Sequence, residues 1–159
     1  RHGRLFLDLG CAVTFIDKTV QPLADLTPQP NADIVEADLE DGSPWPLTGQ
    51  TFDAVIIVNY LHRPLFDHIM ASLSPGGVLI YETFARGNEA FTRPRNPDHL
   101  LKSGELLDLV AGKLQVVAYD HGRVGSADLP GVKQRLCAVG DLNASEREDG
   151  YPDPHPLQP

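Results

Sequence analysis

Polar residues stand at the ends of several short apolar runs in this sequence, and such positions could form a ligand site. In an open α/β sheet, ligands bind beyond the carboxyl ends of the parallel strands. A carboxylate there offers two acceptor oxygens at a fixed separation, which suits two neighbouring hydroxyl groups or an amino group. We therefore take the polar residues at the run ends as candidate binding residues. They are Asp8 and Gly10, Asp17, Asp38, Asn59 and Glu82.

Seven short apolar runs are predicted to form the strands that position these residues. The stretches "FDAVIIV" and "GVLIYE" are almost uninterrupted, which is typical of strands covered by helices on both faces. Apolar spacing predicts helices over 64–73 and 103–111, the second capped by Ser103, and a shorter helix from Thr19 to Leu26. This alternation predicts an α/β fold with a mostly parallel sheet. The seven runs are Leu5–Leu9, Ala12–Ile16, Ile34–Ala37, Phe52–Val58, Val78–Tyr81, Leu114–Tyr119 and Arg135–Val139.

The last two runs predict an antiparallel hairpin. The segment between them contains three glycines and one proline but no helical period. Residues 141–159 contain four prolines, many charged side chains and few apolar ones, so we expect a tail outside the core. The predicted organisation is one domain over residues 1–140 and a proline-rich tail over 141–159.

The first two runs are too close together for two parallel strands. A parallel crossover needs about a dozen residues or more, but only Cys11 separates Gly10 from Ala12. An antiparallel hairpin, a natural deletion or residues omitted from the sequence would each explain the short junction. We favour omission at Gly10–Cys11, in the first βα unit, because a glycine-rich cofactor loop would lie there. A distance too long for a peptide bond is then expected at this point.

Composition and charge favour a small-molecule partner. The 159 residues carry a net charge of −9, which disfavours binding to nucleic acids and to anionic membranes. Cys11 and Cys137 show neither metal-ligand nor disulfide spacing, the histidines show no metal-ligand spacing, and we expect a reducing, cytoplasmic location. We identify no signal peptide and no apolar run long enough for a membrane span. The sequence gives no indication of the oligomeric state.

Six landmarks in order give the chain a resemblance to a known family. They are "LFLDLG", "VTFID", "EADL", "FDAVIIVNYLH", "LSPGGVLIYE" and the closing hairpin. From about Arg4 to Gly140 the chain resembles a class I S-adenosylmethionine-dependent methyltransferase. The stretch "YETFARGNEAFTRPRNPDHLLKSGELL" is similar to small bacterial methyltransferases of a tellurite-resistance-like or uncharacterised subgroup. The resemblance implies a Rossmann-like, doubly wound fold with a seven-stranded, mostly parallel sheet and a C-terminal antiparallel hairpin.

The resemblance also implies which residues bind S-adenosylmethionine. Asp17 would accept hydrogen bonds from the ribose hydroxyls, and Asp38 would face the adenine amino group, with the Leu39 N–H toward a ring nitrogen. Asp8 would help to hold the amino group of the methionine part, and Asn59 would border the sulfonium. Asp8 could instead cap a loop, and Asp17 could cap a helix. The implied cofactor-binding residues are Asp8, Gly10, Asp17, Asp38, Leu39 and Asn59.

Residues after the fourth run and at the end of the fifth would face the acceptor. His62 could take a proton, or it could pack against the helix that follows it. A carboxylate is costly to bury unpaired, which favours a functional role for Glu82. The implied catalytic residues are Tyr60, His62 and Glu82, and the substrate-binding residues are Arg63, Tyr81, Arg93 and Arg95.

Residues 84–102 form a long segment without clear periodicity, as lids and binding loops do. The segment carries four basic residues, two of them Arg93 and Arg95, against two acidic ones. This local positive charge raises the hypothesis of an anionic acceptor. Pairing with the acidic surface of the same chain is the alternative, and we favour it because exposed charge clusters are usually solvated faces.

The sequence therefore predicts methyl transfer from S-adenosylmethionine to a small-molecule acceptor. One alternative is a methyltransferase-like domain without catalysis that serves as a binding module, because the glycine-rich segment after "LDLG" is absent. A nicotinamide-dependent oxidoreductase is a further alternative, although that fold has no matching need for an acid at Asp38.

Overall fold

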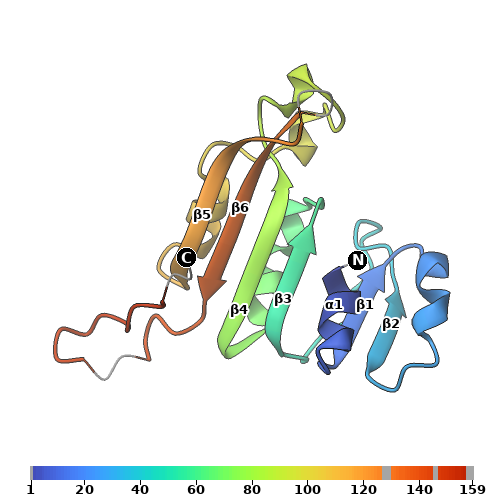
Figure 1. Cartoon of the computed structure of the whole chain (residues 1–159), viewed down its shortest axis with the longest axis horizontal. Helices are drawn as coiled ribbons and strands as arrows, with labels where there is room; N and C mark the ends of the chain where they lie inside the picture. Colours follow the sequence, from blue (N-terminus) through green and yellow to red (C-terminus); the bar gives the residue numbers. More distant parts are fainter. Residues whose placement is uncertain (1, 127–129, 145–146, 157–159) are drawn as a thin grey trace. The chain divides into compact units, whose positions relative to one another are not determined.

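The computed structural model describes residues 2–126, 130–144 and 147–156. The chain forms two compact units, Arg1–Thr48 and Gly49–Pro159. Figure 1 shows the elements of both, and each unit is described by itself below. Within the described residues, no helix is long and apolar enough to cross a membrane. The prediction of one domain over 1–140 stays a prediction.

The first unit contains a two-stranded parallel sheet. Its strands pair in register from Val13 opposite Ala32 to Asp17 opposite Glu36. Gly3 lets the first helix approach the sheet, because a Cβ at this position would lie 2.2 Å from the ring of Phe15. Among the described residues of this unit, the buried apolar side chains are Leu7, Leu26 and Leu47. The elements are α1 (His2–Asp8), β1 (Val13–Asp17), the 3-10 helix η1 (Gln21–Leu26) and β2 (Ala32–Glu36).

The strand predicted at Leu5–Leu9 is wrong, because residues 5–8 belong to α1 and Leu9 lies in the turn that follows. Only four residues separate α1 from β1, too few for a parallel crossover. Gly10 ends the helix in a left-handed conformation with φ 86°. Its N–H donates to Leu7 O at 2.9 Å, and the Cys11 N–H donates to Phe6 O at 3.0 Å. The expected break at Gly10–Cys11 is therefore replaced by a tight helix cap.

The second unit is built on a four-stranded mixed sheet in the order β3-β4-β6-β5. β3 pairs parallel with β4, whereas β6 pairs antiparallel with β4 and with β5. This arrangement confirms the C-terminal hairpin. The strands are β3 (Phe52–Val58), β4 (Leu73–Phe84), β5 (Gln115–Val124) and β6 (Gly131–Val139), and the helices are η2 (Arg63–Leu65), α2 (Phe66–Ala71), η3 (Asn88–Ala90), η4 (Pro97–His99) and α3 (Glu105–Val110).

The seven-stranded, mostly parallel sheet is not observed. The described residues contain six strands in two sheets, and in the larger sheet one of the three pairings is parallel. The reason is the first junction, which turns the first predicted strand into α1. The α/β class itself is confirmed.

Helices cover one face of the four-stranded sheet. In Figure 1 both α2 (green) and α3 (yellow) lie behind the strands. Side chains that point to this face, such as Leu79, Tyr81 and Leu136, are buried. Their neighbours along the strands point to the other face, where Ile80 is 36% exposed and Glu82 is partly exposed. This alternation places Glu82 and the basic residues of β6 on the face away from the two helices.

Two local details differ from the sequence predictions. α2 ends before Ser72, whose N–H and hydroxyl both donate to His68 O, so the chain enters β4 at once. α3 begins after Gly104, which has φ 76°, and not after a Ser103 cap. The 3-10 helix η1 accommodates Pro22 in its first turn, as expected for the segment from Thr19 to Leu26.

The C-terminal segment has no buried residue among 141–144 and 147–156. Asp141 Oδ2 lies 2.7 Å from His155 Nε2, and Gln115 Nε2 donates to Asp153 O at 3.3 Å. The described part of this segment thus contacts the start of β5, and the proline-rich tail over 141–159 stays a prediction. Residues 145–146 and 157–159 of the predicted tail lie outside the described residues.

Candidate functional site

In the first unit, Asp17 and Asp38 come together at the carboxyl ends of two neighbouring strands. Asp17 ends β1, and its carbonyl accepts the N–H of Ala37 at 3.0 Å, directly before Asp38. Each carboxylate uses one oxygen within its own loop: Asp17 Oδ1 accepts from the Thr19 N–H and Asp38 Oδ1 from the Glu40 N–H, both at 3.0 Å. Both side chains are exposed, so each keeps a second oxygen for a ligand.

Asp8 and Gly10 are not at this edge. Asp8 is the last residue of α1, and Gly10 is its cap. The carbonyl of Cys11, beside Gly10, accepts from Asn31 Nδ2 at 2.8 Å, and Asn31 directly precedes β2. Asp8 and Gly10 are therefore near the amino ends of β1 and β2, whereas Asp17 and Asp38 are at the carboxyl ends. Leu39 follows Asp38 and is partly exposed.

In the second unit, four polar residues meet where β3 and β4 end, and we call them the strand-end cluster: Asn59, Glu82, Lys133 and Arg135. Asn59 has φ 57°, a left-handed conformation that a non-glycine residue rarely adopts. Its N–H donates to Glu82 O at 2.8 Å, and its Oδ1 accepts from Lys133 Nζ at 2.7 Å. The sequence predicted Asn59 and Glu82 as site residues and missed the two cations.

Glu82 is fully paired within the cluster. Its Oε1 accepts from Lys133 Nζ at 2.5 Å and its Oε2 from Arg135 Nε at 2.6 Å. Burial by itself would raise the pKa of Glu82, but the hydrogen bonds and charges of Lys133 and Arg135 outweigh it and hold this pKa below its ordinary value. Glu82 is thus an ionised hydrogen-bond acceptor at neutral pH and a weak base.

Tyr81 is buried, and its hydroxyl donates to the carbonyl of Tyr60 at 3.1 Å. Burial, followed by the nearby Tyr60 and Glu105, raises the pKa of Tyr81. Phe66 meets the Tyr81 ring edge-to-face, with ring centroids 6.3 Å apart. The Tyr81 side chain therefore packs between β4 and α2 and fixes the backbone at Tyr60.

His62 is half-buried and lies directly before η2. Its carbonyl accepts the N–H of Leu65 at 3.1 Å, so its backbone belongs to the first turn of that helix. Its side chain makes no cap hydrogen bond.

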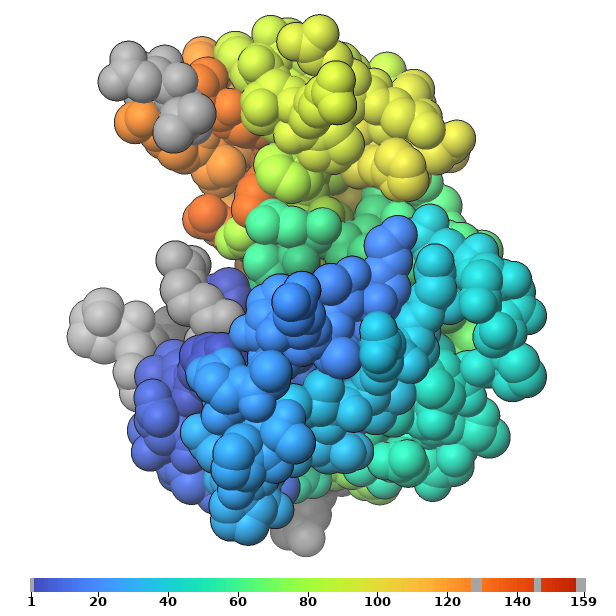
Figure 2. All heavy atoms as spheres, turned by 90° about the vertical axis from the view of Figure 1, so that its right-hand side faces the viewer, coloured from blue at the N-terminus to red at the C-terminus, as the bar shows by residue number. Residues whose placement is uncertain are grey.

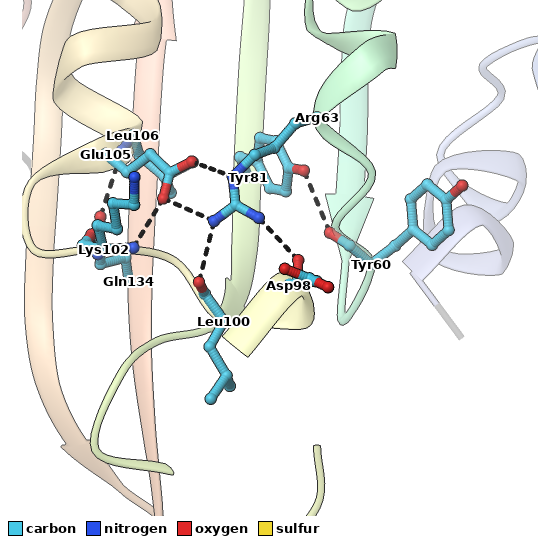
Figure 3. A network of polar contacts seen from close by, with 9 residues as sticks. All are labelled: Tyr60, Arg63, Tyr81, Asp98, Leu100, Lys102, Glu105, Leu106 and Gln134. Atoms are coloured by element: carbon cyan, nitrogen blue, oxygen red, sulfur yellow. Dashed lines mark hydrogen bonds and ion pairs between the residues drawn. The ribbon is translucent and has the colours of Figure 1, made fainter. Parts of the chain in front are cut away.

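Arg63 lies at the centre of the network in Figure 3. Its Nε and Nη2 donate to the two carboxylate oxygens of Glu105 at 2.6 and 2.9 Å. The same guanidinium donates to Asp98 O at 2.7 Å and to Leu100 O at 3.0 Å. Four of its five N–H groups are thereby used to join η2, the segment around η4 and α3. Arg63 was predicted to bind substrate, but here it holds the protein's own backbone.

The loop between β4 and α3 is closed at its base, and we call residues 85–101 the Ω loop. Ala85 and Leu101 form an isolated parallel bridge. The fully buried Asn88 accepts the Val132 N–H at 3.1 Å through Oδ1 and donates to Thr92 O and Pro94 O. In Figure 2 the yellow-green and yellow atoms of the loop lie against the orange end of β5 and β6.

Arg93 and Arg95 are exposed on this loop, and neither side chain makes a hydrogen bond or ion pair with the described residues. Arg86 pairs with Glu89 of the same loop at 3.1 Å, and Arg123 of β5 lies 4.6 Å from the centroid of the Phe91 ring. Pairing within the chain therefore accounts for part of the predicted basic patch, while Arg93 and Arg95 stay accessible.

No known protein family matches the sequence, and no curated protein does. Solved structures do match. NodS, an N-methyltransferase from Bradyrhizobium japonicum that was also solved with S-adenosyl-L-homocysteine, is 17% identical at a TM-score of 0.58 over 80% of this chain and 72% of NodS. TehB from Haemophilus influenzae is 15% identical at a TM-score of 0.65, over 85% of this chain but 52% of TehB.

A third similar structure acts on RNA. It is the 16S rRNA (adenine(1408)-N(1))-methyltransferase from Catenulisporales acidiphilia, in a W203A mutant, which is 16% identical at a TM-score of 0.55 over 96% of this chain and 79% of that one. The chain spans about half the length of TehB and most of the other two. This chain therefore has the fold of the class I S-adenosylmethionine-dependent methyltransferases.

Proposed function

We propose that this protein transfers a methyl group from S-adenosylmethionine to a small-molecule acceptor. The observation that carries the proposal is the pair of exposed carboxylates, Asp17 and Asp38, at the carboxyl ends of adjacent parallel strands. The fold shared with methyltransferases supports it, as does the S-adenosyl-L-homocysteine bound to NodS.

The residues present fit the adenosine half of the cofactor. Asp17 and Asp38 each keep one carboxylate oxygen for a ribose hydroxyl or an adenine amino group, and the Leu39 N–H follows at the same edge. Asp8 and Gly10 lie near the amino ends of β1 and β2, so this arrangement does not bring them to the edge that holds Asp17 and Asp38. When bound, the cofactor supplies a methyl group on a positively charged sulfur, so the chain's own task is to orient an acceptor and exclude water.

Among the predicted catalytic residues, the geometry divides the roles. Glu82 is an ionised acceptor whose two oxygens hold Lys133 and Arg135 in place, so it positions these cations and is a poor general base. His62 is the remaining candidate for taking a proton. The backbone of Tyr60 is held by Tyr81, which suits a fixed wall of the site.

An anionic small molecule is the acceptor class that the charges favour. The chain as a whole has a net charge of −9, which opposes binding to RNA. In the second unit, Arg93 and Arg95 of the Ω loop are exposed cations, and Lys133 and Arg135 of β6 flank the single carboxylate of Glu82.

A binding module without catalysis is the second candidate. The specific observation in its favour is that α1 and a helix cap occupy the segment where the strand and glycine-rich loop of a cofactor site were expected. Such a module would not bind adenosyl ligands.

Calorimetric titration of the whole chain distinguishes the candidates. We expect S-adenosylmethionine and S-adenosyl-L-homocysteine to bind saturably and at least about tenfold more tightly than NAD⁺, a difference of about 1.4 kcal/mol. Preference for NAD⁺ would favour an oxidoreductase, and absence of binding by all three ligands would favour the module. Release of S-adenosyl-L-homocysteine in the presence of candidate acceptors would then report turnover.

A further inference from the structure

The two basic residues of the strand-end cluster are placed by the register of β4 and β6. Arg135 lies directly opposite Glu82, and Lys133 lies opposite Phe84. Residues two apart on a strand point to the same face, so both cations flank the carboxylate of Glu82. All of these side chains stand on the sheet face away from α2 and α3.

Lys133 is the enclosed member of the pair. Its side chain is 12% exposed. Its ammonium donates to Glu82 Oε1 and Asn59 Oδ1 and lies 4.9 Å from the centroid of the Phe84 ring. Three faces of the ammonium are therefore engaged, which fixes its charge in place and leaves little room for a ligand.

Arg135 is the accessible member. Its side chain is 46% exposed, and Nε donates to Glu82 Oε2. Nη1 forms a longer ion pair with Asp120 Oδ2 at 3.9 Å, and neither terminal nitrogen makes a hydrogen bond to the described residues. The Nε contact orients the guanidinium, and the Nη edge is the one that can bind a carboxylate or phosphate with two hydrogen bonds.

The other arginines near this end of the sheet lack that combination. Arg63 donates four hydrogen bonds, to Glu105, Asp98 and Leu100. Arg93 and Arg95 are exposed on a loop, and nothing in the described residues fixes their planes. Arg135 alone among these four joins an oriented plane on a strand to an Nη edge without hydrogen bonds to the described residues.

We propose that the Nη edge of Arg135 binds an ionised oxygen group of the acceptor, a carboxylate or a small oxyanion. Glu82 orients the guanidinium, Lys133 offsets the charge of Glu82, and Asp120 offsets that of Arg135, so these four charges sum to zero. Asp120 Oδ2, which lies 3.9 Å from Arg135 Nη1, is either displaced by the ligand or stays as a weak ion-pair partner of Arg135. Naming the ligand as the acceptor rests on the proposed function, whereas the anion site itself does not.

The test follows the arginine Nε–H resonances of the whole chain by NMR while benzoate or inorganic phosphate is added. We expect a saturable shift of the Arg135 Nε–H signal with either anion and none with benzamide, which has the same ring without the charge. Calorimetric titration with the same anions measures the variants, which lack the Arg135 Nε–H signal. Arg135→Gln should weaken anion binding about tenfold or more, and Arg135→Lys, which keeps the charge without the fork, by less.

Arg86→Gln is the matched control. Arg86 is 52% exposed, and its Nε also contacts a glutamate, so the change in charge and type is the same. This variant should bind the anion as the wild type does. Far-UV circular dichroism checks that each variant is folded. If Arg135→Gln does not fold, Arg135→Lys is used to measure the change in anion binding.

Four results would overturn the inference. The first three are no saturable shift with either anion, an equal shift with benzamide, and unchanged binding in both Arg135 variants. The fourth is loss of binding only in an Arg93→Gln/Arg95→Gln variant, which would place the anion site on the Ω loop. A separate titration with S-adenosyl-L-homocysteine keeps the two proposals apart. Absence of S-adenosyl-L-homocysteine binding would contradict the proposed function but would not contradict the anion site.

Discussion

Two arginine–glutamate pairs of the second unit, Arg63–Glu105 and Arg135–Glu82, have the same chemistry and opposite surroundings. The side chains of Arg63 and Glu105 are 33% and 16% exposed, and four donors of Arg63 end on the chain itself. The side chains of Arg135 and Glu82 are 46% and 27% exposed, and Arg135 donates one hydrogen bond, from Nε, beside a longer ion pair with Asp120. A guanidinium that donates most of its N–H groups to the chain holds segments together. One that donates a single N–H group is held in place and can still bind a ligand. The number of donors left over thus separates a structural arginine from a ligand-binding candidate.

The largest effect should come from the Arg63–Glu105 pair. Arg63→Gln should lower the free energy of unfolding by about 2 kcal/mol, because it leaves the partly buried Glu105 without its charge partner and frees the carbonyls of Asp98 and Leu100. Urea unfolding followed by circular dichroism measures this loss. A loss of unfolding free energy no larger than that in Arg86→Gln would show that the Arg63–Glu105 pair contributes no more than a surface ion pair. The contrast between the two pairs would then be wrong.

Asn59 should be the most sensitive backbone position of the strand-end cluster. Asn59→Ala should cost about 1 kcal/mol of unfolding free energy, because alanine is strained at φ 57° and the contact to Lys133 is lost. Asn59→Gly should recover most of the loss, since glycine tolerates this conformation. Equal losses in both variants would show that the side-chain contact dominates and that the conformation does not.

The same pairs predict a pH dependence. The pKa of Glu105 is below its ordinary value, because Arg63 and the Lys102 N–H outweigh the effect of burial. A lowered pKa in the folded state contributes stability above the ordinary value near 4.5, and this contribution is lost as the pH falls below it. The stability difference between wild type and Glu105→Gln should therefore shrink between about pH 5 and pH 3. A difference that is constant over this range would contradict the pairing.

The smallest effect should come from the Arg135–Glu82 pair. Arg135→Gln should change the free energy of unfolding by no more than about 0.5 kcal/mol, because exposed ion pairs contribute little. Its effect should appear in ligand binding and not in stability. A loss as large as that of Arg63→Gln, measured by the same urea titration, would make both pairs structural.

Six of the seven predicted strands are present, and the sequence placed β3 at its observed bounds, Phe52–Val58. The failure at Leu5–Leu9 has a physical cause, because a short apolar run does not distinguish a strand from a helix. Two signals favoured the helix: the four-residue spacing to the next strand, and Gly10 in the position of a helix cap.

The candidate site was predictable where it depends on strand ends and unpredictable where it depends on register. Asp17, Asp38, Asn59 and Glu82 follow from strand ends alone. Lys133 and Arg135 alternate in "VKQR", which puts two cations on one face, but their contact with Glu82 requires the antiparallel register of β4 and β6. Sequence likewise gives no sign that the buried amide of Asn88 closes the Ω loop.

The central claim is that the carboxylates at the ends of β1 and β2 bind an adenosyl ligand, and one calorimetric comparison tests it most directly. S-adenosyl-L-homocysteine is titrated into the wild type, Asp17→Asn, Asp38→Asn and the control Asp33→Asn, whose exposed acid lies within β2. We expect affinities about tenfold weaker in the first two variants, since hydrogen bonds to charged groups contribute about 1.5–3 kcal/mol, and no change in the control. Wild-type affinity in Asp17→Asn and Asp38→Asn would contradict this claim.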